Sequence, residues 1–213
     1  MKTLFHILTL PIAMVGLLAC GTADSASGGS GGSGGAGGLG GSGGVGGSGG
    51  VGGSPSERRM FVTSTIQSAN LGGIAGADAL CATQADGAGL DGIFEAWLST
   101  ISSSVSDRLS HDGGPFVLVD ETIVANDWDD LVDGALLAPI NLDAMGQART
   151  GDVWTGTLPT GASYAVEDCT AFTSASTTVG QALCGSSTSA TTTWTNNQPA
   201  RCSSTLRLYC IEQ

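Results

Sequence analysis

Very few side chains in this sequence could act as catalytic groups. The two histidines are His6, inside a leading apolar run, and His111, so a Ser-His-Asp relay would depend on the single imidazole of His111. Asp107 and Ser110 are its neighbours, but residues adjacent in sequence rarely form a triad. The sequence contains no CxxC pair, no HExxH motif and no glycine-rich phosphate loop followed by lysine. We therefore expect His111 to be an exposed loop residue, and we expect no enzymatic activity.

Carboxylates surround Trp128. Asp127, Asp129, Asp130 and Asp133 lie within one short segment, and Asp127 and Asp130 are spaced so that both would lie on one face of a helix. Carboxylate oxygens are ligands that Ca²⁺ accepts. Two interpretations stay open, a solvated helix face and a calcium site that uses Asp127 and Asp130. We expect no other metal and no resident cofactor.

The start of the chain combines a positive charge, an apolar run and a cysteine. Lys2 precedes the apolar residues 4–18, a run too short and too interrupted to span a bilayer. It ends in Leu17-Leu18-Ala19-Cys20, which is similar to bacterial lipoprotein signals. Cleavage would remove residues 1–19, and Cys20 would carry the acyl chains that anchor the protein to a bilayer. An ordinary secretory signal with an incidental cysteine is the alternative.

Residues 20–55 have the composition of a spacer. From residue 27 to 54 the chain is almost only Gly and Ser, which cannot bury enough apolar surface to offset its conformational entropy. A Gly-rich coil of this length has an end-to-end distance of about 30–35 Å. We therefore expect a disordered linker that holds a globular head, residues 56–213, away from the lipid.

The head is long enough for one domain and is strongly acidic. Of the chain's 19 acids only Asp24 lies outside the head, and Lys2 is the one basic residue outside it, so the head carries the whole net charge of −12. Such a surface repels nucleic acid and anionic lipid. We expect its four tryptophans to be packing residues of the core.

Apolar periodicity and turn residues predict a mixed α+β domain with two short helices and irregular loops. We expect the second helix to be capped by Asn126 and to reach Gly134, and segment 93–98 is open between strand and helix. The remaining predicted elements are a strand at 59–64, a helix at 76–88 ended by Gly89, a tight hairpin of 116–119 with 123–124, and a terminal strand at 206–211.

Five cysteines remain in the head after the lipid-bearing Cys20 is set aside. An odd number in a compartment that permits disulfides leaves one thiol over. The residues alone allow many ways of choosing two pairs, and their spacing does not select among them. They are Cys81, Cys169, Cys184, Cys202 and Cys210.

A family resemblance covers nearly the whole head. The head resembles endostatin, the C-terminal domain of collagens XV and XVIII, and it is also similar to bacterial secreted lipoproteins of unknown function. The matching segments are individually short, but they follow in the same order along both chains. They are Gly76-Ala77-Asp78-Ala79-Leu80-Cys81, Phe94-Glu95-Ala96-Trp97-Leu98-Ser99, Asp107-Arg108, Pro115-Phe116-Val117-Leu118-Val119, Val153-Trp154-Thr155-Gly156, Gly180-Gln181-Ala182 and Leu208-Tyr209-Cys210-Ile211-Glu212.

The resemblance implies a C-type-lectin-like (endostatin-like) fold with a mixed, mostly antiparallel sheet. In that fold the first and last strands pair and a nested set of disulfides closes the domain. Carried over by position, the pattern joins Cys81 to Cys210 and Cys169 to Cys202. It leaves Cys184 without a counterpart, and we expect a buried or idle thiol there.

The same resemblance implies partners that must be tested against these residues. Heparin binding by endostatin depends on clustered arginines and its zinc on N-terminal histidines; this acidic head has neither, so we expect neither ligand. Calcium-dependent lectins place carbonyl-bearing side chains before a proline in the region of Asn196, Asn197 and Gln198. Here Pro199 is followed by Ala200, so the EPN or QPD triplet is absent. A calcium-mediated glycan site is the hypothesis that these residues leave open.

We therefore expect a lipid-anchored, extracytoplasmic binding module of the bacterial cell envelope. Its loops between Pro139 and Arg201 would contact a protein or a glycan. Gly21 supplies no acidic retention signal after Cys20, which favours the outer membrane in a cell with two membranes. The alternatives are a structural envelope lipoprotein without a specific ligand and, last, a hydrolase that uses His111.

Overall fold

The computed structural model describes residues 56–213. The predicted signal (residues 1–19), the predicted acylation site Cys20 and the predicted linker (residues 20–55) lie outside the described residues. The described strands are β1 (Arg58–Val62), β2 (Phe94–Ala96), β3 (Phe116–Leu118), β4 (Ile123–Ala125), β5 (Asp152–Trp154), β6 (Gln181–Ser186), β7 (Gln198–Arg201) and β8 (Arg207–Glu212). The helices are α1 (Gly73–Ala88), α2 (Val105–Arg108), α3 (Trp128–Leu131), α4 (Cys169–Phe172) and the 3₁₀ turn η1 (Thr192–Trp194).

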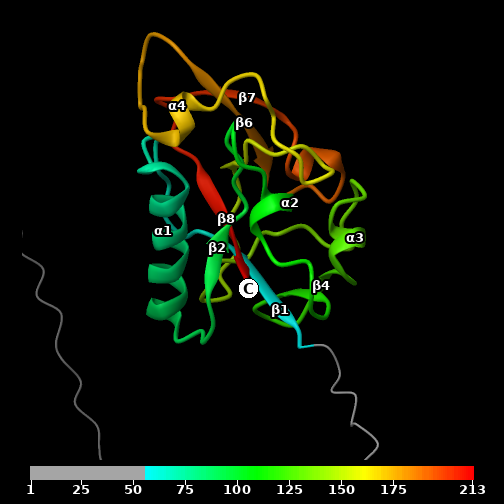
Figure 1. The fold of residues 1–213 in the computed structure, drawn as a ribbon. Helices are drawn as coiled ribbons and strands as arrows, with labels where there is room; N and C mark the ends of the chain where they lie inside the picture. The colour runs from blue at the N-terminus through cyan, green and yellow to red at the C-terminus, as the bar shows by residue number, and fades with distance from the viewer. Residues whose placement is uncertain (1–55) are drawn as a thin grey trace, which may run out of the picture. The chain divides into compact units, whose positions relative to one another are not determined.

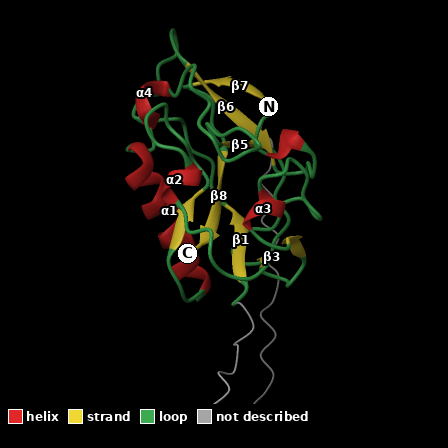
Figure 2. Cartoon of the chain, turned by 45° about the vertical axis from the view of Figure 1, so that its right-hand side comes forward, coloured by secondary structure: helices red, strands yellow, loops and turns green. Residues whose placement is uncertain are grey.

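The strands form one mixed sheet around β8, as Figures 1 and 2 show. Its order is β4-β3-β1-β8-β5-β6-β7, and β2 also pairs with β8. The pairs β1–β3 and β5–β8 are parallel, and the other pairs are antiparallel. The described residues therefore form an α+β domain, and the predicted pairing of the first and last strands is confirmed.

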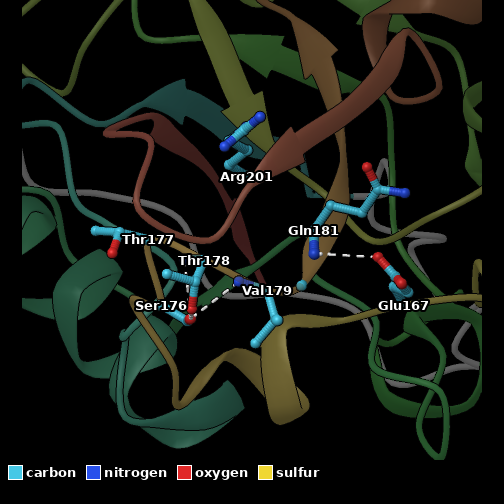
Figure 3. Close-up of a pocket in the computed structure, with 8 residues that line it drawn as sticks. Glu167, Ser176, Thr177, Thr178, Val179, Gln181 and Arg201 are labelled. Carbon is cyan, nitrogen blue, oxygen red and sulfur yellow. Dashed lines mark hydrogen bonds between the residues drawn. The ribbon is translucent and has the colours of Figure 1, made fainter.

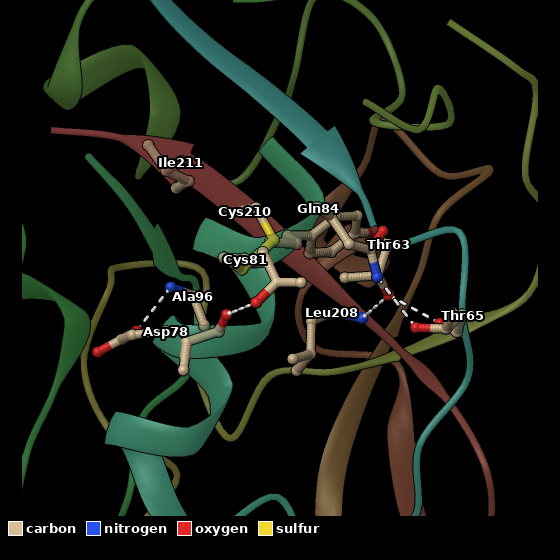
Figure 4. The surroundings of a disulfide bond; sticks show 12 residues. Thr63, Thr65, Asp78, Cys81, Gln84, Ala96, Leu208, Cys210 and Ile211 are labelled. Atoms are coloured by element: carbon tan, nitrogen blue, oxygen red, sulfur yellow. Dashed lines mark hydrogen bonds between the residues drawn. A yellow bond between two sulfur atoms is a disulfide. The ribbon is translucent and has the colours of Figure 1, made fainter. Parts of the chain in front are cut away.

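Helix α1 covers one face of the sheet. Ala77, Cys81 and Ala85, at helical spacing, are its buried side chains, and the helix packs against β2 and β8. Its end at Ala88 is the predicted one, because Gly89 adopts the left-handed conformation that closes a helix. Cys81 is joined to Cys210 of β8, with 5.4 Å between the Cα atoms (Figure 4).

Both faces of the sheet are buried, and β8 contributes to each. Its residues Leu208 and Cys210 lie in the core beneath α1, together with Phe61 and Trp154. The alternate residues Tyr209 and Ile211 lie in the opposite core. The terminal strand was thus predicted as a strand, but its central place in the sheet depends on partners far away in the chain.

The opposite core is built around tryptophan, and we call it the tryptophan core. The ring of Trp97 lies 4.9 Å from that of Trp194 and 6.0 Å from that of Trp128, between centroids. The indole N–H of Trp97 donates to Thr195 Oγ1 at 2.8 Å. With Trp154 in the core under α1, all four tryptophans are buried, so the prediction that they pack in the core is confirmed.

Three predictions about the helices are wrong: their number, and the cap and the end of the second predicted helix. The described residues contain two further single-turn segments, α2 and α4, which are capped by Ser104 and Asp168 and have no apolar repeat that the sequence could reveal. The cap of α3 is Asp127, not Asn126, since the Asp127 carboxylate accepts the N–H of Asp130. This helix ends at Leu131, before the predicted Gly134.

Candidate functional site

The candidate site lies at the end of the sheet formed by β6 and β7, beside α4. A disulfide joins Cys169 of α4 to Cys202, the residue after β7, with 5.5 Å between the Cα atoms. The two disulfides therefore connect the pairs that the resemblance implies. In Figures 1 and 2 this end of the head lies opposite the start of β1, where the described chain begins.

The α4 turn has an unusual backbone. Cys169, Thr170, Ala171 and Phe172 have φ angles of 54°, 59°, 52° and 57°, so the four residues form one turn of left-handed helix. Each L-residue in this conformation costs about 1–2 kcal/mol. Asp168 holds the turn, because its carboxylate accepts the N–H of Ala171 at 2.8 Å and the N–H of Ile101 at 3.0 Å. Strain of this kind is kept only where surrounding contacts impose it.

Gly180 is required where the loop after α4 enters β6. Its φ is 87°, and a Cβ there would lie 2.9 Å from the Cys202 sulfur. Only glycine allows the loop to pass this close to the Cys169–Cys202 disulfide. The sequence therefore places glycine at the point where the chain turns over the disulfide.

Two adjoining depressions open in this surface, and we call them together the α4 depression. The first has a volume of about 280 Å³ and is lined by Glu167, the loop of residues 176–180, Gln181 and Arg201. The second has a volume of about 330 Å³ and continues past the disulfide to Ile101 and Val166. Figure 3 shows Gln181 and Glu167 on one side of the first depression, the loop on the other and Arg201 above them.

Apolar side chains stand exposed along the α4 depression. Ile101, Val166 and Val179 are 50%, 63% and 72% exposed, and all three line its second part. Several branched aliphatic side chains gathered beside a cavity mark a contact surface, whereas single exposed ones are ordinary. The depression thus offers apolar contact next to polar groups.

The polar groups of the α4 depression include an unpaired cation. Within residues 56–213, Arg201 is the one arginine whose guanidinium makes neither a hydrogen bond nor an ion pair. Glu167 accepts the backbone N–H of Gln181 at 3.1 Å. The Ser176 hydroxyl accepts the N–H groups of Thr178 and Val179, which shapes the loop. Arg201 is therefore available to a ligand.

The two residues predicted to bind calcium form hydrogen bonds at the start of α3. Asp127 accepts from Asp130, while Asp130 accepts both the backbone and the side-chain N–H of Asn126, so the two carboxylates form the N-terminal cap of α3. Within the range 56–213, no three His, Cys, Asp or Glu side chains come together as a metal-binding group. Calcium at Asp127 and Asp130 remains a hypothesis from the sequence.

The loop residues predicted for a glycan site have backbone roles. Asn196 and Asn197 follow η1, and the N–H of Asn197 donates to the carbonyl of Cys184 at 2.9 Å. Gln198 begins the edge strand β7 opposite Cys184. The side chains of Asn197 and Gln198 are exposed. None of these three residues lines either part of the α4 depression.

His111 is an exposed loop residue, as predicted. Its ring stacks on Trp128 with 3.9 Å between centroids, and Nε2 lies 2.9 Å from the carbonyl oxygen of Ser106. Its sequence neighbour Asp107 is bonded instead to the Ser104 hydroxyl, at 2.6 Å, as part of the cap of α2. The Ser110 hydroxyl accepts the N–H of Asp112 at 3.3 Å, so the three triad candidates are engaged in separate local contacts.

Cys184 is a buried free thiol, as expected. Its sulfur donates to the carbonyl of Gln198 at 2.9 Å. Burial, with the negative charge of Asp152 adding to it, raises the pKa of this thiol to about 11. The protonated form therefore dominates at neutral pH, and protonated thiols are poor nucleophiles.

No protein-family model matches the chain, and no curated protein sequence is significantly similar to it. Among residues 56–213, no helix has both the length and the apolar character needed to cross a membrane.

The key residues of the α4 depression escaped the sequence patterns. The predicted loop range between Pro139 and Arg201 includes most of its lining, but Ile101 comes from a distant segment. Gln181 and Arg201 become neighbours only through the register of β6 and β7, in which their Cα atoms are partners. The one local signal was Val166 and Val179, two branched apolar residues isolated in polar loops.

Proposed function

We propose that this protein is a lipid-anchored, extracytoplasmic binding module whose acidic head recognises a protein or glycan at the α4 depression, without catalysing a reaction. The observation that carries the proposal is the composition of this surface. An unpaired arginine, the hydroxyls of the loop at 176–178 and three exposed aliphatic side chains line the two adjoining parts of the α4 depression. Binding sites commonly combine apolar contact with a few polar groups that fix orientation.

The architecture of the head supports this proposal. We propose a C-type-lectin-like, endostatin-like fold, supported by the paired first and last strands and by the nested Cys81–Cys210 and Cys169–Cys202 disulfides. A cross-linked scaffold suits an extracytoplasmic domain. It also holds recognition loops in position, since Cys169 and Cys202 tie α4 to the end of β7.

The position of the depression agrees with a tethered head. The start of β1 and the helix α4 lie at opposite ends of the described domain (Figure 1). A linker that arrives at Ser56 would leave the depression on the end away from its attachment. We propose anchoring through Cys20 at the cell envelope, with the outer membrane as the expected location in a cell with two membranes.

A binding role without catalysis is supported by the state of the nucleophiles. The imidazole of His111 stacks on Trp128 and is not among the residues that line the depression. The Cys184 thiol is buried and protonated at neutral pH. General base catalysis needs a titratable group within hydrogen-bond reach of the proton it removes.

The test compares two threonine substitutions in the purified full-length chain. Thr178→Trp fills the depression, whereas Thr122→Trp adds the same bulk to the exposed β3–β4 turn. Binding is measured by titration with a panel of acidic and neutral oligosaccharides and of envelope peptides, with and without EDTA. We expect a saturable ligand whose affinity falls at least tenfold in Thr178→Trp and is unchanged in Thr122→Trp.

Two outcomes would refute the proposed function. One is the absence of any saturable ligand, which favours a structural envelope component. The other is equal loss of binding in both variants, which places the contact elsewhere. The comparison of binding with and without EDTA reports separately whether the ligand requires calcium.

A further inference from the structure

Arg201 differs from every other arginine of the described head. Arg59, Arg108 and Arg149 are paired with carboxylates, and Arg58 and Arg207 donate to backbone carbonyls. Arg201 is exposed and has no such partner within residues 56–213. In a head with three acids for every arginine, a guanidinium left without a partner is not explained by the stability of the fold.

Gln181 lies directly across from Arg201. Their Cα atoms are partners in the antiparallel β6–β7 pair, so both side chains lie on the same face of the ribbon at neighbouring positions. The side-chain amide of Gln181 makes no hydrogen bond within the described range, while its backbone N–H donates to Glu167. A planar guanidinium and a free amide on neighbouring strands provide several N–H donors at one edge of the depression, which suits a carboxylate.

The rest of the first depression suits hydroxyl groups. Glu167 keeps acceptor capacity beyond its bond to Gln181, and the loop adds the hydroxyls of Ser176, Thr177 and Thr178. Val179 supplies an exposed apolar surface beside them. A ligand that carries one carboxylate, several hydroxyls and a small apolar face is an acidic sugar. The volume of about 280 Å³ is at the small end for ligand pockets.

The charge of the head limits how acidic the ligand can be. With a net charge of −12, the surface around the depression repels long polyanions. A single carboxylate placed on Arg201 avoids most of that repulsion. The site is therefore suited to one acidic sugar in an otherwise neutral saccharide, not to a heparin-like chain.

We propose that the α4 depression binds a saccharide through one uronic-acid-type carboxylate, which Arg201 and Gln181 hold by charge-assisted hydrogen bonds. This inference rests on the proposed function and names its ligand class. Glu167 and the hydroxyls of the loop form hydrogen bonds with the sugar hydroxyls. Specificity then comes from the carboxylate, because without it the guanidinium gains no charged partner on binding.

The experiment titrates the full-length chain with three saccharides and one peptide. The saccharides are a glucuronic-acid-terminated disaccharide, its methyl ester and the neutral glucose analogue; the peptide is short, with one carboxylate. We expect the acid to bind at least tenfold more tightly than the ester or the neutral sugar. Arg201→Gln should abolish this preference, and Arg201→Lys should keep part of it, because lysine retains the charge without the bidentate geometry.

Ala82→Glu is the control for net charge. It makes the same change of one unit as Arg201→Gln, on the exposed face of α1, and should keep the preference for the acid. Equal binding of acid and ester by the unmodified chain refutes the inference without any variant. Tighter binding of the peptide than of the acidic disaccharide also refutes it. If the neutral sugar binds and Thr178→Trp blocks it, the proposed function survives while the carboxylate inference fails.

Discussion

The left-handed turn of α4 predicts that a substitution by glycine will raise the free energy of unfolding. Ala171 is exposed and has a φ of 52°. Relieving a left-handed L-residue gains about 1–2 kcal/mol, while glycine loses about 0.5–1 kcal/mol through its greater freedom in the unfolded chain. Ala171→Gly should therefore stabilise the head by about 0.5–1 kcal/mol. For a domain of this size the midpoint of thermal unfolding would rise by about 2 °C.

The matched control is the same substitution in a right-handed helix. Ala82 is exposed in the interior of α1, where glycine costs about 1 kcal/mol. Both variants are unfolded with urea, with disulfides intact, and their free energies of unfolding are compared with that of the unmodified chain. Opposite signs support the left-handed turn. If Ala171→Gly destabilises the protein as much as Ala82→Gly does, the turn is right-handed in solution and the reasoning is wrong.

Two further predictions concern the cross-link under α1 and the response to acid. The Cys81–Cys210 bridge spans 129 residues, so the double alanine variant should lose about 5 kcal/mol of unfolding free energy in the chain-entropy model; peptide mass mapping that finds both thiols free in the native protein would contradict the pairing. Asp143 is buried, which by itself would raise its pKa, but hydrogen bonds from the Gln147 N–H and from Arg149 hold the pKa below its usual value. A lowered carboxyl pKa stabilises the fold above the unfolded value of about 3.9, and this contribution disappears as the pH falls through the folded pKa. In urea titrations Asp143→Asn should thus cost about 2 kcal/mol at pH 7 and progressively less as the pH falls through the folded pKa of Asp143, whereas the exposed Asp129→Asn should cost little throughout.

The parts of the fold that sequence predicted correctly are those with a local cause. The helix ending at Ala88 follows from the spacing of Ala77, Cys81 and Ala85 and from a glycine that can turn left-handed. The β3–β4 hairpin also formed where two apolar runs flank a short turn. In these segments the residues that make the structure are close together in the chain.

The single-turn helices α2 and α4 were missed for a physical reason. Each is held by one capping side chain, Ser104 or Asp168, and by packing, with no repeat of apolar residues. The assignment of Asn126 as a cap failed by one residue because Asn and Asp are both good caps. Which of the two adjacent residues caps the helix depends on the path of the chain from the preceding strand, β4.

The chemical properties of this protein also separate into those with a local cause and those that depend on tertiary structure. Its sequence alone determined the acidic charge, the lack of a second histidine in the head, the odd cysteine and the local ends of α1, because these properties depend on composition or on near neighbours. Only the tertiary structure decided that Arg201 would lack a partner, that Gln181 would lie beside it and that Ile101 would join the same surface. The register of β6 and β7 brings Gln181 and Arg201 together, and long-range packing adds Ile101. Strand register is fixed by contacts between segments that are separate in the chain, so near neighbours in sequence do not reveal it.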